Sequence, residues 1–216
     1  MKNRLHDKKA GIAILISLIV LSLAEIIFRH FFLREMISST ANYAETLAVI
    51  ILALTILIFT LKGKDRVCYI LYGAWIAYFV LDQFFELPSH FINLISSLVN
   101  VGAGIDVGII VYIGLIVHVL SYVGVILMGI LLVEYMNDGS IYNRAFNITC
   151  VFTFVLLLFS VCISVYNVVV GTPIALLLLV FNNIYRIIMV FLFVFFAYDS
   201  ARKQSWHFHA RYNIQW

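Results

Sequence analysis

The chain has 216 residues, of which 64% are hydrophobic and 12% charged, and its formal net charge is +3. Soluble domains are about 45–50% apolar and about 25% charged, so this composition excludes an ordinary soluble domain. The small positive charge also argues against a nucleic-acid-binding protein. Cys68, Cys150 and Cys162 are far apart and form no CxxC pair, which argues against a disulfide framework, a zinc site and a thiol-redox site. We predict neither a metal nor a cofactor.

Six apolar stretches are each long enough to cross about 30 Å of hydrocarbon as a helix. They cover residues 11–33, 44–62, 67–87, 107–133, 146–168 and 174–198. A helix satisfies its own backbone in lipid, and these runs are much longer than the ~10-residue strands of a membrane barrel. We therefore predict an all-α membrane protein, in which residues 1–216 form one polytopic domain built as a six-transmembrane-helix bundle.

The first two stretches differ in their polar content. The first follows a basic N-terminus and is longer than the core of a signal peptide, so we expect an uncleaved helix. Its Glu25 and Arg29 are four residues apart, a spacing that favours an ion pair along the helix. The second stretch has only Thr55 and Thr60 as interior polar residues, which predicts a helix on the lipid-facing rim.

The third stretch carries two acidic residues on one helical face. Asp82 and Glu86 are one turn apart, and like charges this close raise the proton affinity of one group or require a cation. After Pro88 the chain has a shorter apolar face over residues 89–101, which is too short to span. We expect this segment to form a short interfacial helix on the outer surface.

The sixth stretch places an arginine near its centre. A charge at that depth costs at least about 2.5–3.5 kcal/mol, so Arg186 needs a partner. Asn182 and Asn183 precede it by one turn, so the three side chains predict either a site for an anion or a structural set of helix cross-links. His118 lies in the fourth stretch, and the sequence leaves open whether its side chain binds a ligand or packs inside the bundle.

The charges expected inside the bundle do not balance. Glu25, Asp82 and Glu86 oppose Arg29 and Arg186, which leaves about one negative charge if all of them ionise. A hydrophobic bundle tolerates that excess only if a proton, a cation or a histidine compensates it. This imbalance is the main reason to expect a coupled ion or proton.

Basic residues in the short loops predict the orientation. With the N-terminus inside, only Arg29 and Arg34 lie toward the outside, and eleven basic residues lie inside. The inner set is Lys2, Arg4, Lys8, Lys9, Lys62, Lys64, Arg66, Arg144, Arg202, Lys203 and Arg211. We therefore expect a cell membrane protein, of the inner or plasma membrane, with both termini cytoplasmic. Its C-terminal tail after Asp199 mixes cations with aromatic rings, which predicts an interfacial tail.

The buried charged residues favour transport, or ion- or proton-coupled translocation. We expect its binding residues to be Glu25, Asp82, Glu86, His118, Asn182, Asn183 and Arg186. One alternative is a non-catalytic subunit or a sensor, since the layout is similar to the membrane input regions of bacterial sensor proteins. A second is an intramembrane enzyme acting on a lipid or peptide, although no nucleophile–base pair and no HExxH motif is present. Besides the lipid bilayer, the open partners are another membrane protein, a second copy, a small ion or an anionic ligand.

Overall fold

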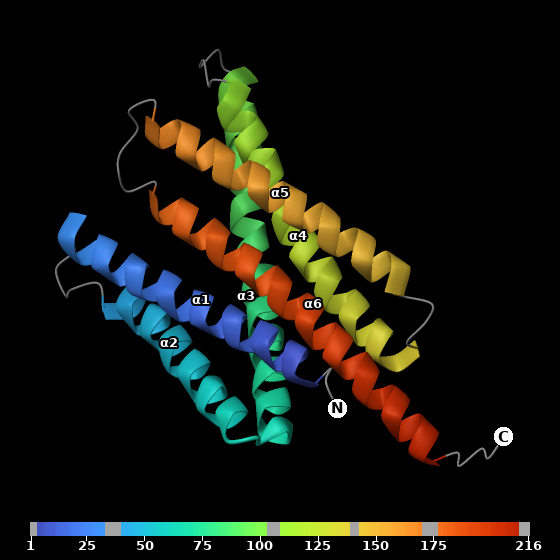
Figure 1. The fold of residues 1–216 in the computed structure, drawn as a ribbon. Coiled ribbons are helices and arrows are strands. Elements are labelled where there is room, and N and C mark those ends of the chain that lie inside the picture. Colours follow the sequence, from blue (N-terminus) through green and yellow to red (C-terminus); the bar gives the residue numbers. More distant parts are fainter. Residues whose placement is uncertain (1–3, 33–39, 103–108, 139–142, 170–176, 212–216) are drawn as a thin grey trace.

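The computed structural model describes residues 4–32, 40–102, 109–138, 143–169 and 177–211. The regular structure in these ranges consists of six α-helices (Figure 1). They are α1 (Arg4–Phe32), α2 (Thr40–Leu61), α3 (Asp65–Gly102), α4 (Ile109–Asp138), α5 (Asn143–Val169) and α6 (Leu177–Arg211). Each of them contains a segment that is long and apolar enough to cross a membrane. The prediction of an all-α chain with six such helices is confirmed.

Successive helices run in opposite directions, so α1 begins and α6 ends at the same end of the bundle (Figure 1). α6 packs against α1, α3, α4 and α5, and it is therefore the helix around which the others gather. In the described ranges α2 packs only against α1 and α3, as expected for a helix on the rim. Which side of the membrane the two ends face stays a prediction.

A tight turn joins α2 to α3. Gly63 has a φ of 70°, a left-handed conformation that glycine adopts without steric cost. The backbone N–H of Lys64 donates to the carbonyl of Phe59 at 3.0 Å, which closes the end of α2. Both helices rise by the same amount per residue away from this turn. Residues at nearly equal sequence distances from Gly63, such as Glu45 and Asp82, are therefore brought to a similar depth.

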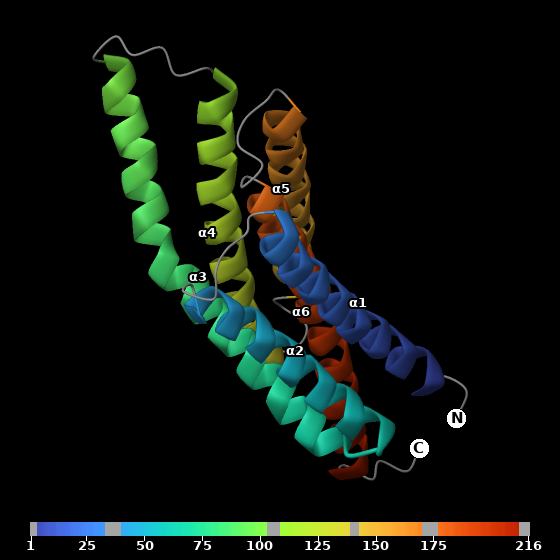
Figure 2. The ribbon, with the colours of Figure 1, turned by 90° about the vertical axis from the view of Figure 1, so that its left-hand side faces the viewer.

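α3 differs from the prediction, because the break expected at Pro88 is absent. The helix continues for 38 residues to Gly102, so the separate outer helix over residues 89–101 is instead the second part of α3. Proline removes one backbone donor and crowds the preceding turn, which bends a helix when the flanking turns remain paired. Figure 2 shows α3 bent partway along its length. Membrane contact of this extension stays a prediction.

α6 is also longer than predicted. We expected the helix to end near residue 198 and a tail to follow, but helical structure continues to Arg211. The side chains of residues 201–211 and the whole of 212–216 lie outside the described part of the chain. The interfacial character of the tail therefore stays a prediction.

Close packing between α3 and α4 depends on a glycine. A methyl group built at Gly129 would lie 2.7 Å from Cγ2 and 2.8 Å from Cγ1 of Val80, well inside van der Waals contact. The absence of a side chain lets the two helices approach each other, as small residues commonly do in membrane bundles. Gly73 on α3 is different, since its nearest neighbour would be Phe196 at 3.5 Å, an ordinary contact distance.

These two glycines make a matched pair of alanine substitutions. Gly129→Ala should destabilise the protein by about 1–3 kcal/mol, because the methyl group overpacks the α3–α4 interface. Gly73→Ala should be neutral or stabilise by up to about 1 kcal/mol, because alanine favours the helix and finds room. Thermal unfolding in detergent, followed by circular dichroism, measures both. Equal melting temperatures for the two variants would contradict the packing described here.

Candidate functional site

A cavity of about 860 Å³ lies where α1, α2, α3 and α6 meet. Its charged lining residues are Glu25, Arg29, Glu45, Asp82 and Glu86. Four carboxyl groups therefore face this space together with one guanidinium group. The volume is in the usual range for small-molecule sites, about 300–1,000 Å³.

Helical geometry brings these acids together from three helices. Arg29 Nη2 lies 2.9 Å from Glu25 Oε1, so the ion pair expected from the spacing is present. Asp82 and Glu86 share one face of α3, as the sequence indicated. Glu45 comes from α2 and reaches the same depth because of the turn at Gly63.

Aromatic side chains form another part of the cavity wall. Trp75, Tyr78 and Phe79 line it from α3, and Tyr185 lines it from α6. The indole N–H of Trp75 donates to the hydroxyl of Tyr185 at 3.3 Å, and the rings of Phe79 and Tyr185 meet edge to face at 5.8 Å. Tyr78 is held less tightly, since 60% of its surface is exposed. The wall thus combines a fixed aromatic corner with one accessible ring.

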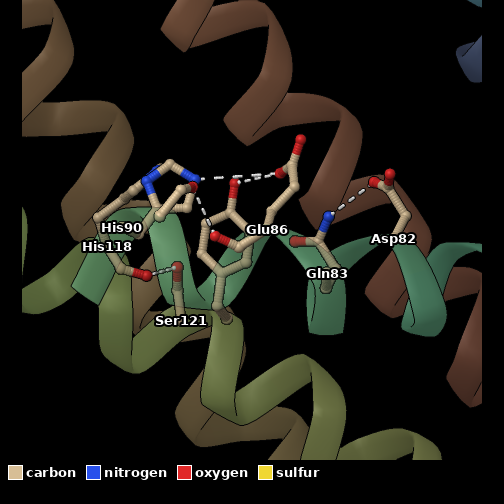
Figure 3. A network of polar contacts seen from close by, with 8 residues as sticks. Asp82, Gln83, Glu86, His90, His118 and Ser121 are labelled. Atoms are coloured by element: carbon tan, nitrogen blue, oxygen red, sulfur yellow. Dashed lines mark hydrogen bonds and ion pairs between the residues drawn. The ribbon is translucent and has the colours of Figure 1, made fainter. Parts of the chain in front are cut away.

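Gln83 contributes a buried amide to the cavity lining. Its Nε2 donates to Asp82 Oδ2 at 3.2 Å, and its oxygen points away from that carboxylate (Figure 3). The amide cannot be reversed without placing two acceptors against each other. Gln83 is 3% exposed, and its Oε1 has no hydrogen-bond partner among the described residues. The amide oxygen is therefore a fixed acceptor that is unpaired and enclosed within the wall of the cavity.

Glu86 connects the cavity to α4. The hydroxyl of Tyr122 donates to Glu86 Oε2 at 2.8 Å, and Nε2 of His90 lies 4.0 Å from the same oxygen (Figure 3). The ring of His90 packs at 4.4 Å from that of Tyr122 and at 4.7 Å from that of His118. His118, which the sequence left open, is therefore part of a cluster of rings beside Glu86.

Arg186 lies behind this cluster and does not line the cavity. It is 0% exposed, and its guanidinium carbon lies 3.9 Å from the centre of the Tyr122 ring, which is a cation–π contact. Within the described ranges, none of its three side-chain nitrogens has a hydrogen-bond partner. Tyr122 consequently contacts Arg186 through its ring and Glu86 through its hydroxyl.

The two asparagines of α6 do not form one patch with Arg186. Asn182 is exposed and lines the cavity. Asn183 is buried and its Nδ2 lies 3.5 Å from Ser164 Oγ on α5. Successive residues of a helix point about 100° apart, which separates these neighbours. The residues that we expected to bind a ligand are thus divided: Asn182, Asp82 and Glu86 line the cavity, whereas Asn183 and Arg186 lie in the interior.

Sequence reasoning missed Glu45, Gln83 and Tyr122. Glu45 stands at the start of its apolar stretch, where it reads as a boundary residue, and its depth follows only from the turn at Gly63. Gln83 is uncharged and directly follows a more conspicuous acid. Tyr122 gives no sequence signal at all, because its role depends on α3 and α6 lying on two sides of its ring.

The chemistry of the cavity suits a positively charged ligand. Carboxylates attract cations, and aromatic faces stabilise them further. No cluster of three or more His, Cys, Asp or Glu residues suited to a metal ion occurs in the part of the chain that the structure describes. Comparison with models of protein families, with curated proteins and with solved structures finds no significant match.

The environment of Arg186 predicts an unusual mutational result. Leaving buried polar groups without partners costs about 1–3 kcal/mol, and a cation–π contact returns only about 0.5–2 kcal/mol. Arg186→Met keeps most of the length of the side chain and removes the guanidinium. Its melting temperature in detergent should equal or exceed that of the wild type.

Arg29→Met is the matched control for this substitution. It removes one partner of the ion pair with Glu25 and should lower the melting temperature. A clear loss of stability in Arg186→Met would show that the guanidinium has a stabilising polar partner, contrary to the arrangement described.

Proposed function

We propose that this chain is a membrane transport protein whose cavity between α1, α2, α3 and α6 binds a translocated cation or proton. The observation that carries the proposal is the lining of that cavity, in which four carboxyl groups face one guanidinium. These groups belong to helices that are apolar enough to cross a membrane. The acidic lining supports the transport of a positively charged species.

The charge of the cavity supports this reading. Arg29 is already paired with Glu25, and Arg186 is held by Tyr122. Among the described residues, no guanidinium therefore pairs directly with Glu45, Asp82 or Glu86. Even when both arginines are counted against the four acids, two negative charges remain. An uncompensated charge within a membrane costs at least about 2.5–3.5 kcal/mol. Protonated acids, a protonated histidine such as His90 or a bound cation would offset this excess.

The position of the cavity suits entry of a ligand from one side of the membrane. It is lined by the last part of α1, the first part of α2 and the beginning of α6, so it lies toward one end of the bundle. In the orientation expected from the basic residues, that end faces outward. Glu86 then extends the polar region toward α4 through Tyr122. A proton or cation arriving from outside would meet the acids first and this contact next.

The main alternative is a sensor or a subunit that binds a ligand in the same cavity without moving it. A sensor or a subunit would use the acidic lining in the same way as a transporter. Measured flux across a membrane distinguishes the transporter from these alternatives. No feature of the described residues favours the enzyme alternative over either of these.

Flux in proteoliposomes tests the proposal. The purified chain should admit protons or cations when a negative inside potential is imposed, as followed by a trapped pH-sensitive dye and by radiolabelled cation uptake. The double variant Asp82→Asn, Glu86→Gln should fall to the level of empty liposomes, because it removes two of the acids that attract the cation.

Glu134→Gln provides the matched control, since Glu134 is an exposed acid near the end of α4 and does not line the cavity. This variant should keep the flux of the wild type. Equal flux in the double variant and the wild type would rule out the cavity as the route. Absence of flux in the wild type would leave binding as the function of the site.

A further inference from the structure

We infer that the ligand of this cavity is an organic ammonium ion, a protonated amine that carries an apolar body. The inference rests on the proposed function only in that the bound cation is taken as the translocated one. Three features of the lining support it: the spread of the acids, the aromatic wall and the free oxygen of Gln83.

The spread of the acids argues against a bare metal ion as the ligand. Metal ions need several oxygen ligands converging at about 2.0–2.6 Å. The carboxyl groups of the cavity come from α1, α2 and α3, and no metal-like cluster forms among the residues that the structure describes. A space of about 860 Å³ is also far larger than an ion requires. An organic cation fills such a space and needs only one or two acids near its charge.

The aromatic wall supplies the surface for an apolar body. Trp75, Phe79 and Tyr185 hold one another through the hydrogen bond and the edge-to-face contact described above. Tyr78, largely exposed one turn before Asp82, offers its ring next to an acid. A cation over such a ring gains about 0.5–2 kcal/mol, and burial of its hydrocarbon adds further affinity.

Gln83 narrows the class of cation. Its Oε1 accepts no hydrogen bond from the described residues, although the side chain is buried and lines the cavity. The contact with Asp82 fixes the amide so that an oxygen, not a nitrogen, is left unpaired. This oxygen is enclosed, so a ligand donor reaches it only when a neighbouring side chain of the wall moves aside. An oxygen acceptor beside acids is suited to an N–H donor. A protonated amine provides that donor, and a quaternary ammonium ion does not.

Isothermal titration with the detergent-solubilised full chain tests the inference. The probes are benzylamine, 2-phenylethylamine and tryptamine, which are protonated at neutral pH because alkyl amines titrate near pH ~10. Two matched compounds accompany 2-phenylethylamine: its trimethylammonium analogue, which keeps the charge without N–H donors, and 2-phenylethanol, which keeps the ring without the charge. At least one amine should bind, and both matched compounds should bind about tenfold more weakly or worse.

Variants locate the site. Gln83→Met keeps the shape and removes the acceptor, so it should weaken amine binding about tenfold and leave the trimethylammonium analogue unchanged. Tyr78→Leu should weaken both cations, and it changes an exposed side chain that does little for the fold. Tyr166→Leu is the control, because Tyr166 is a half-exposed tyrosine of α5 outside the cavity. Its affinity should equal that of the wild type.

Several outcomes would overturn the inference. They are equal binding of the alcohol and the amine, equal binding of the quaternary ion and the amine, no binding of any amine, and unchanged affinity in both Gln83→Met and Tyr78→Leu. The flux assay keeps this inference separate from the transport proposal. Amine binding without flux sustains the ligand class and refutes transport. Proton or inorganic cation flux without amine binding would sustain transport and refute the ligand class.

Discussion

The arrangement of this bundle depends on one phenol ring that separates two charges. Tyr122 receives the Arg186 guanidinium on its face and donates its hydroxyl to Glu86. A buried charge normally has an oppositely charged partner in contact, yet the buried Arg186 is stabilised by a ring. The half-exposed Glu86 accepts a hydrogen bond from the neutral hydroxyl of the same residue. Glu86, Tyr122 and Arg186 belong to α3, α4 and α6, so this contact lies where these three helices meet. α6 itself packs on four other helices.

The separation has a consequence for the cavity. If Arg186 formed a bidentate pair with Glu86, both charges would be neutralised within the helix interface. With Tyr122 between them, Glu86 keeps its place in the cavity lining beside Asp82. Arg186 is fully buried and does not line the cavity, so the site offers carboxylates to a ligand together with only one arginine, Arg29. Such a lining suits a cation better than the anion that the sequence alone suggested for Arg186.

The sequence predicted the number and approximate limits of the helices because length and hydropathy determine which segments can cross a membrane. It also predicted the Glu25–Arg29 pair and the shared face of Asp82 and Glu86, since both depend on spacing within one helix. It failed where the answer depends on how helices face one another. A helix that is apolar all round carries no pattern to show which side is buried, so neither the role of Tyr122 nor the separation of Asn182 from Asn183 could be inferred. Pro88 was misread as the end of a helix, although it lies inside α3.

The remaining question is why a bundle would keep an amide oxygen without a partner beside a group of acids. An unsatisfied buried acceptor costs about 1–3 kcal/mol, and an apolar residue at position 83 would avoid that cost. Gln83 instead has its nitrogen fixed by Asp82 and its oxygen directed away from it. Such a group is useful when a donor arrives from outside the protein, because it is already oriented and loses little entropy on binding. In the proposed binding of an amine, the acids attract the positive charge over some distance, and the oriented oxygen distinguishes between cations on contact.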